Sequence, residues 1–177
     1  MSTRDATALR IAIIGNSGSG KSSLAAKAGS GLKLPVYDLD LLHWHADGRK
    51  REEAEAKILV AEHAAGAAWI IEGVFGWLTE IALPRAKALV WLDLPWAECR
   101  EGLLQRGAQH GETEGDQAAL LAWAGDYWTR TSSSSFAGHL QLYETFGGGK
   151  IRLQTRADVS ALPPQTIRRL AGGNDAF

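Results

Sequence analysis

The chain has 177 residues, of which 45% are hydrophobic and 22% are charged, with 19 Lys and Arg against 20 Asp and Glu. This composition fits one globular domain that is large enough to bury a sizeable core. The formal net charge of −1 disfavours a protein whose main role is to coat nucleic acid. A single cysteine excludes an internal disulfide and a cysteine-rich zinc site.

No apolar signal core occurs in Met1 to Leu9, and no apolar run approaches the roughly 18 residues that a membrane span needs. The single cysteine fits a reducing compartment. We therefore expect a cytoplasmic protein with one domain, residues 1–177, as a monomer or a homodimer. Neither a membrane nor a nucleic acid is an expected partner.

Alternating apolar runs and amphipathic segments predict an α/β fold. Strands are expected at residues 10–15, 34–39, 69–72, 88–94 and 151–153. Helices are expected from Lys21, over 49–65, 96–106, 116–129 and 136–146, and after Pro163 and Pro164. Because strands alternate with helices, we expect a mainly parallel sheet with right-handed crossovers.

A complete G-x-x-x-x-G-K-[ST] motif follows the first predicted strand and opens a predicted helix. Its glycines allow a tight loop whose backbone N–H groups point at an anion, and the helix N-terminus adds its positive dipole end. Lys21 would reach the β- and γ-phosphates, and the Ser22 hydroxyl would ligate Mg²⁺. A glycine- and serine-rich turn that matches by chance is the alternative. The predicted nucleotide-binding residues are Gly15, Asn16, Ser17, Gly18, Ser19, Gly20, Lys21, Ser22 and Ser23.

The motif alone does not separate kinases from GTPases, motor ATPases or regulators. The guanine-reading signatures N-K-x-D and D-x-x-G do not occur, and 177 residues leave little room for effector modules. We therefore predict a phosphotransferase that uses ATP and Mg²⁺ and acts on a small-molecule acceptor. A nucleotide-gated regulatory or binding protein with slow ATPase activity is the alternative.

Acidic residues follow three of the predicted strands. Asp38 and Asp40 come at the end of the second strand, at the sheet edge where ligands bind in open α/β folds. One carboxylate could hold water on Mg²⁺, and the other, for which we choose Asp40, could orient or deprotonate an acceptor hydroxyl. For both, a helix N-cap or a solvated loop is the alternative. Glu72 and Asp93 end the third and fourth strands and are candidate magnesium ligands, with a loop or cap anchor as the alternative.

Kinases of this size bring arginines over the moving phosphoryl group on a closing flap. The polar stretch 107–115 predicts such a lid, which would extend to about residue 135. Arg100, Arg106 and Arg130 flank this stretch and are candidate catalytic groups, with surface salt bridges as the alternative. Arg156 could lie beside the adenine ring or be solvated.

The tryptophans divide into two groups by their surroundings. Trp69, Trp91 and Trp123 occur in apolar patterns and are predicted to lie in the core. Trp44 and Trp77 follow the predicted site strands, and each could wall an acceptor pocket or belong to the core.

Four segments together resemble a known group: RIAIIGNSGSGKSSLA, LPVYDLDLLHW, WIIEG and ALVWLDLPWAECREGLLQR. Their order and spacing are similar to those of adenylate-kinase-like P-loop proteins, and most similar to the small bacterial group called DNA topology modulation proteins. The resemblance covers residues 10–130. It implies a three-layer αβα fold with a five-stranded parallel sheet of order 2-3-1-4-5, an acceptor region and a helical lid. In that order the third strand neighbours the first, which favours Glu72 over Asp93 as the metal ligand.

The chain departs from this group after the third strand. The group usually has D-G-N-Y followed by an arginine, whereas this chain has Glu72-Gly73-Val74-Phe75, with Trp77 at the place of the arginine and Ala82 at that of a later one. Apolar groups there would reject a phosphorylated acceptor, so we expect a neutral or cationic hydroxyl- or amine-bearing molecule. The residues expected to face the acceptor are Asp38, Asp40, His43, Trp44, Gly73, Phe75 and Trp77; for His43 a structural hydrogen bond is the alternative.

Overall fold

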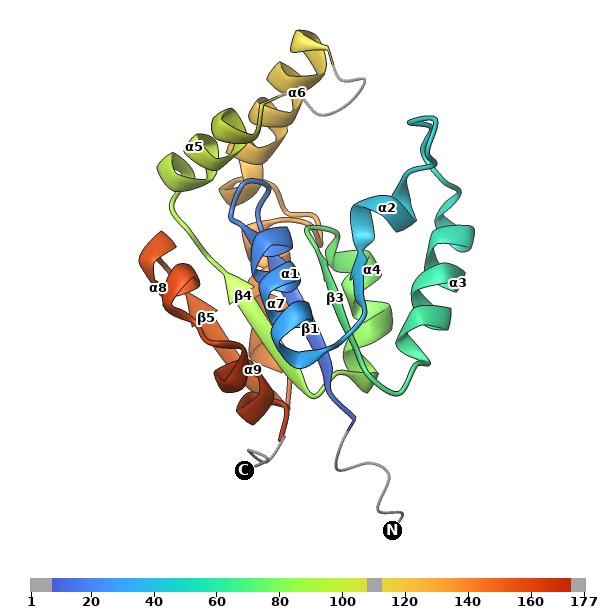
Figure 1. Ribbon diagram of the computed structural model, residues 1–177. Coiled ribbons are helices and arrows are strands. Elements are labelled where there is room, and N and C mark those ends of the chain that lie inside the picture. Colours follow the sequence, from blue (N-terminus) through green and yellow to red (C-terminus); the bar gives the residue numbers. More distant parts are fainter. Residues whose placement is uncertain (1–7, 108–112, 173–177) are drawn as a thin grey trace.

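A computed structural model describes residues 8–107 and 113–172. Its centre is a five-stranded parallel sheet in the order β2-β3-β1-β4-β5, as predicted (Figure 1). The strands are β1 (Arg10–Gly15), β2 (Val36–Asp38), β3 (Trp69–Gly73), β4 (Ala88–Leu92) and β5 (Gly149–Leu153). The helices are α1 (Lys21–Leu32), α2 (Leu39–His43), α3 (Glu53–Ala64), α4 (Gly76–Ala82), α5 (Trp96–Arg106), α6 (Glu114–Gly125), α7 (Phe136–Thr145), α8 (Arg156–Ala161) and α9 (Pro164–Leu170), with short 3₁₀ turns η1 (Leu83–Arg85) and η2 (Asp126–Trp128).

The three middle strands are apolar because both of their faces are covered. Alternate residues of β1 point to opposite faces: Ile11 and Ile13 pack in one cluster with side chains of α1, α8 and α9, while Ala12 and Ile14 pack in another with Leu142 of α7. Every residue of β3 and β4 is buried. Helices thus cover both faces of the sheet, which is the predicted three-layer arrangement.

The second predicted strand is shorter than expected because a helix starts inside it. The strand ends at Asp38, whose carboxylate accepts a hydrogen bond from the Asp40 N–H at 2.8 Å and so caps α2. The strand therefore does not continue to Leu39 as predicted, and the N-cap alternative is confirmed for Asp38. The helix predicted over 49–65 begins only at Glu53, since Lys50 instead pairs with Trp44 in an isolated antiparallel bridge.

Two helices, α5 and α6, extend beyond the carboxyl ends of the strands. They lie across from α2, which follows the edge strand β2 on the other edge of the sheet (Figure 1). The bounds predicted for α5 are confirmed, and α6 begins earlier than predicted because Thr113 and Asp116 form a capping box. Part of the predicted lid, residues 108–112, lies outside the described residues. The helices α4 and α8 were not predicted. No described helix has the length and apolar character required to cross a membrane.

Candidate active site

The predicted phosphate loop joins β1 to α1 with the geometry of an anion cradle. Gly18 and Gly20 have φ of 79° and 97°, in the left-handed region that side chains rarely adopt. A Cβ at Gly18 would lie only 2.0 Å from the Cys99 backbone oxygen, so the loop packs directly against the backbone of α5. The structure thus has a tight glycine loop between a strand and a helix at the place where the sequence predicts one.

Lys21 lies within this loop and is 8% exposed. Its ammonium donates a hydrogen bond to the backbone oxygen of Asn16 at 2.9 Å. The Ser19 hydroxyl in the same loop is buried without a hydrogen-bond partner among the described residues. A cation and an unpaired hydroxyl inside a glycine-rich loop fit a phosphate group, whose oxygens would satisfy both.

Three carboxylates gather beside Lys21. Asp38 and Glu72 lie in register on neighbouring strands, and Asp40 follows in α2. Burial raises the pKa of each carboxyl above its ordinary value, and the positive charge of Lys21 offsets part of this rise. The nearby Ser22 side chain also lowers the pKa of Glu72. The predicted magnesium ligands Ser22 and Glu72 are therefore close enough to interact, which suits Mg²⁺ held between a hydroxyl and a carboxylate.

Asp93 has a different partner. Its carboxylate accepts hydrogen bonds from the Arg152 guanidinium at 2.6 and 2.9 Å, which ties the end of β4 to β5. The same guanidinium lies 4.3 Å from the ring centre of Trp91. This ion pair makes Asp93 a structural anchor, the alternative that the sequence left open, and makes Glu72 the better metal candidate.

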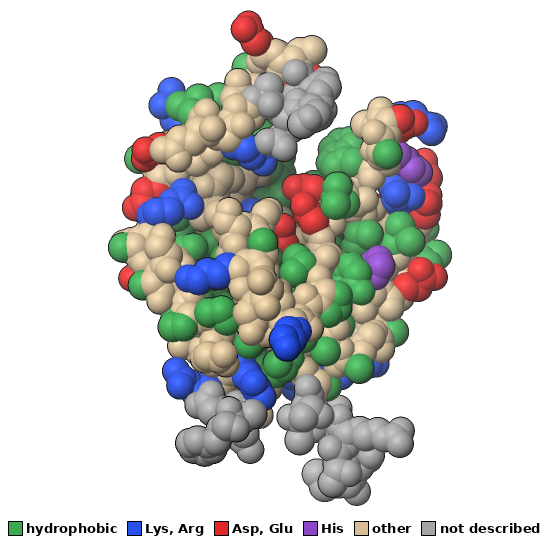
Figure 2. Space-filling model, in the orientation of Figure 1, with side chains coloured by type: hydrophobic (Ala, Val, Ile, Leu, Met, Phe, Trp, Pro, Cys, Tyr) green, Lys and Arg blue, Asp and Glu red, His purple; other side chains and the backbone are tan. Residues whose placement is uncertain are grey.

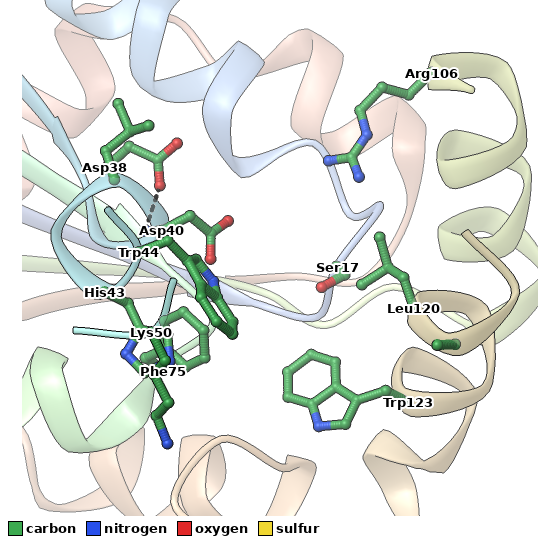
Figure 3. Close-up of a pocket in the computed structure, with 12 residues that line it drawn as sticks. Ser17, Asp38, Asp40, His43, Trp44, Lys50, Phe75, Arg106, Leu120 and Trp123 are labelled. Atoms are coloured by element: carbon green, nitrogen blue, oxygen red, sulfur yellow. Dashed lines mark hydrogen bonds between the residues drawn. The ribbon is translucent and has the colours of Figure 1, made fainter. Parts of the chain in front are cut away.

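A cavity of about 690 Å³ opens between the phosphate loop, α2 and α6. Figure 2 shows the hollow with acidic side chains on its wall, and Figure 3 shows the lining side chains pointing inward from both sides. The volume is typical of a pocket for a small molecule. The cavity is lined by Ser17, Asp38, Asp40, Leu41, His43, Trp44, Lys50, Phe75, Arg106, Ala119, Leu120 and Trp123.

Aromatic side chains form much of the cavity wall. Trp44, Phe75 and Trp123 come from three separate segments, and Trp44 is 42% exposed (Figure 3). The prediction that Trp123 lies in the core is wrong, because α6 extends away from the sheet and directs this ring into the cavity. The buried His43 ring contacts Phe75 and Trp44 at centroid distances of 4.3 and 4.7 Å, and its Nδ1 has no partner.

Trp77 and Gly73 do not line the cavity, contrary to prediction. Trp77 lies on the far side of His43, with the two ring centres 5.5 Å apart, and the Lys57 ammonium lies over its ring. Gly73 is buried, and a Cβ there would lie 2.6 Å from the Leu39 Cβ. Trp69 and Trp91 are fully buried, as predicted.

The four candidate arginines have different surroundings. Arg106 at the end of α5 lines the cavity, with its guanidinium directed toward the acids (Figure 3). Arg130 instead lies over the Trp123 ring at 3.9 Å and donates to the backbone oxygens of Trp123 and Ser134. Arg100 is exposed on α5 and is not part of the lining.

Arg156, predicted to lie beside the adenine, supports the phosphate loop from outside. Its guanidinium donates to the backbone oxygens of Ser19 at 2.7 Å, Gly18 at 3.0 Å and Glu98 at 2.9 Å. Loop carbonyls that point away from a bound anion are thereby satisfied. Arg156 is the first residue of α8. The sequence signal for this helix start is the pair Thr155 and Asp158, which form a capping box.

Three further side chains line the cavity that the sequence did not predict there: Lys50, Leu120 and Leu41. Lys50 reaches the cavity because its segment pairs with Trp44 rather than forming helix. Leu120 lies on α6, whose long apolar sequence hides which residues face a ligand. Leu41 is 73% exposed, so this apolar side chain contacts solvent at the mouth of the cavity.

No family model matches this chain, and no curated protein matches it. Solved structures do resemble it. A shikimate kinase from Bacteroides thetaiotaomicron has a TM-score of 0.54 at 18% identity, covering 92% of this chain and 97% of that one. A gluconokinase from Sinorhizobium meliloti 1021 has a TM-score of 0.52 at 19% identity, covering 93% and 89%. A sugar kinase from a Janibacter species has a TM-score of 0.51 at 15% identity, covering 92% and 91%.

At these identities the likeness establishes the fold, which is that of P-loop kinases. The shared fold extends over nearly the whole chain. The narrower resemblance to DNA topology modulation proteins finds no counterpart among these comparisons and stays a prediction.

Proposed function

We propose that the protein is a kinase that transfers the γ-phosphoryl group of Mg-ATP to a hydroxyl or amine of a small molecule. The observation that carries this proposal is the juxtaposition of Lys21, Asp40 and Glu72 where the phosphate loop meets a cavity of about 690 Å³. The fold supports it, because it is shared with proteins named as shikimate kinase, gluconokinase and sugar kinase.

In the nucleotide half of the site, backbone N–H groups of the loop bind the phosphate oxygens. Lys21 exchanges its hydrogen bond to the Asn16 oxygen for the β- and γ-phosphates. Ser22 and Glu72 would hold Mg²⁺, which supplies positive charge against the triphosphate. Arg156 keeps the loop in shape from behind.

In the acceptor half, Asp40 accepts the proton of the acceptor hydroxyl as that oxygen bonds to the γ-phosphorus. The bond from the γ-phosphorus to the bridging oxygen breaks at the same time, and ADP leaves. Because burial raises its pKa, the Asp40 carboxylate is a stronger base than an ordinary aspartate. Arg106 faces the same space and can neutralise charge on the group in flight.

The walls of the cavity favour an acceptor with a flat or apolar portion. Trp44 and Trp123 offer ring surface to such a portion, and Phe75 adds a third ring to the cavity wall. Lys50 and Arg106 balance the charges of the two aspartates there. The apolar walls, and not the net charge of the cavity, would therefore disfavour a phosphorylated acceptor.

The test is an acceptor panel with γ-labelled ATP and Mg²⁺. The panel sets the four common nucleoside monophosphates against their nucleosides, hydroxylated sugars and aromatic amino alcohols. We expect transfer to a neutral or cationic member, abolished in Lys21→Ala and weakened in Trp123→Ala. Efficient phosphorylation of a monophosphate would contradict the acceptor class. ATP hydrolysis that no acceptor stimulates would favour a nucleotide-gated regulatory protein.

A further inference from the structure

Asn16 occupies the second position of the phosphate loop, yet its side chain points out of the loop to α6. It is 1% exposed. Its Nδ2 donates a hydrogen bond to the backbone oxygen of Ala124 at 2.9 Å, across 108 positions of the sequence. Its Oδ1 accepts from the Ser17 N–H at 2.8 Å, and its own backbone oxygen accepts from Lys21 at 2.9 Å. One residue therefore links the loop lysine to the helix that walls the acceptor cavity.

The residue next to Ala124 is Trp123, whose ring lines that cavity (Figure 3). Arg130 lies over the Trp123 ring at 3.9 Å and donates to the Trp123 and Ser134 backbone oxygens. Trp123 is thus held directly by Arg130 within its own segment, and its neighbour Ala124 is held by Asn16 from the phosphate loop. Of these two contacts, only the one from Asn16 reaches the nucleotide half.

Phosphates in the loop would compete with the Asn16 backbone oxygen for the Lys21 ammonium. When the ammonium turns to the phosphates, the Asn16 peptide loses a partner, and the same residue holds α6 through its side chain. We propose that Asn16 is a positioning residue that transmits nucleotide occupancy to α6 and Trp123. Because coupling between sites is reciprocal, nucleotide and acceptor then change each other's affinity. This inference rests on the proposed nucleotide site.

A purely structural contact would hold α6 in the same way with or without nucleotide. Coupling predicts a nucleotide-dependent change at α6 that requires the Asn16 amide. The two roles are distinguished by measuring α6 while only the nucleotide site is filled, which requires no knowledge of the acceptor.

The first measurement uses the unaltered protein with Mg²⁺ and AMP-PNP, a non-hydrolysable ATP analogue. Hydrogen exchange of the amides in 118–125 is compared with and without the analogue. Acrylamide quenching of Trp123 is obtained as the difference between the protein and its Trp123→Phe variant. We expect the analogue to change the exchange rates by about fivefold or more, the lower range of a coupling free energy between sites, and to change the quenching of Trp123 measurably.

The second measurement repeats this in Asn16→Ser, which is too short to reach Ala124, and in Asn16→Asp, which keeps the acceptor for Ser17 but loses the donor. The AMP-PNP affinity of each variant is measured first, and the comparison is made at saturating AMP-PNP, where the response of α6 should be lost. Ala122→Ser, on the exposed side of α6, is the matched control and should keep the full response.

Each outcome decides one claim. Absence of AMP-PNP binding in the unaltered protein would contradict the proposed function itself. Binding without a response at α6 would overturn the coupling and leave the proposed function standing, even if neither Asn16 variant folds. A full response in folded Asn16 variants would also overturn it.

Discussion

The two halves of the cleft are built differently. In the nucleotide half, the backbone makes the site, and the groups around it are closely packed: Gly18 lies against the α5 backbone and Arg156 satisfies the loop carbonyls. In the acceptor half, side chains from several segments make the site, and Trp44 and Leu41 stay 42% and 73% exposed. Under the proposed function, the backbone of the loop would fix the triphosphate, whereas separate side chains would select the acceptor and take its proton.

Lys21→Ala should have the largest effect, because it removes the cation of the nucleotide half. We expect turnover of Mg-ATP to fall about a hundredfold or more, which corresponds to roughly 3 kcal/mol of transition-state stabilisation. The free energy of unfolding should fall by about 1.5–3 kcal/mol, since the charged ammonium donates one hydrogen bond to a backbone oxygen. Steady-state kinetics and chemical denaturation measure the two. Lys57→Ala, on the surface helix α3, is the control, and equal rates in Lys21→Ala and the parent would refute the site.

Asp40→Asn should break the acceptor half alone. Transfer should fall about a hundredfold, the usual contribution of a general base, while Mg-ATP affinity changes less than about threefold. The raised pKa of Asp40 also predicts that transfer declines in acid at a pH above 3.8, the ordinary value, because the protonated carboxyl cannot accept a proton. Nucleotide binding, transfer and its pH profile are measured together. Equal losses of ATP affinity and transfer would place Asp40 on the metal side.

His139 lies in the buried core on α7, outside both halves of the cleft, and should produce a pH-dependent stability. It is fully buried, its Nε2 donates to the Val74 oxygen at 2.9 Å, and its Nδ1 accepts from the Tyr127 hydroxyl at 2.7 Å. Burial lowers its pKa from 6.5 to about 3, so the fold keeps it neutral while the unfolded chain protonates below pH 6.5. Stability is therefore lost as pH falls below 6.5, by about 2 kcal/mol at pH 5.

Denaturant titrations at pH 7 and pH 5 would measure this loss, and His139→Gln should lack it. His63→Gln, an exchange at a histidine outside the cleft, should behave like the parent. A pH dependence that survives in His139→Gln would show that another group carries it.

Glu72→Gln should give the smallest effect of these changes. It should raise the free energy of unfolding, whereas the changes above lower activity or stability. Burial raises the pKa of Glu72, so its ionised form destabilises the fold at neutral pH. The neutral amide should raise the free energy of unfolding at pH 7 by about 1 kcal/mol, a usual gain when a functional group is removed. The gain should disappear below pH 4.5, where the unfolded carboxyl also carries a proton. Glu80→Gln is the exposed control, and destabilisation by Glu72→Gln would contradict this account.

The sequence predicts the loop between β1 and α1 well because such a loop is a local structure. Eight consecutive residues, a buried strand before them and a helix after them suffice to define it, and the sheet order follows from the family resemblance. The acceptor half is predicted only in part, since its side chains come together from distant segments. Asp38 and Asp40 were found from their place at a strand end, even though the strand stops at Asp38 and the helix α2, which was not predicted, follows it.

Trp123 and Lys50 show why the rest was not predicted. The apolar residues of α6 have the same pattern whether the helix packs on the sheet or extends from it, so Trp123 looks like a core residue. Lys50 lies in a charged stretch that suggests a helix, and only the bridge to Trp44 brings it to the cavity. Arg130 was chosen for its charge, but its neighbours hold it over the Trp123 ring.

The most direct test of the central claim is a crystal structure of the protein with Mg²⁺ and AMP-PNP. The account predicts triphosphate in the Gly15–Lys21 loop, with Lys21 moved from the Asn16 oxygen to the phosphates, and the γ-phosphate facing Asp40 across the cavity. A nucleotide bound elsewhere, or a γ-phosphate directed away from Asp40 and the cavity, would contradict it.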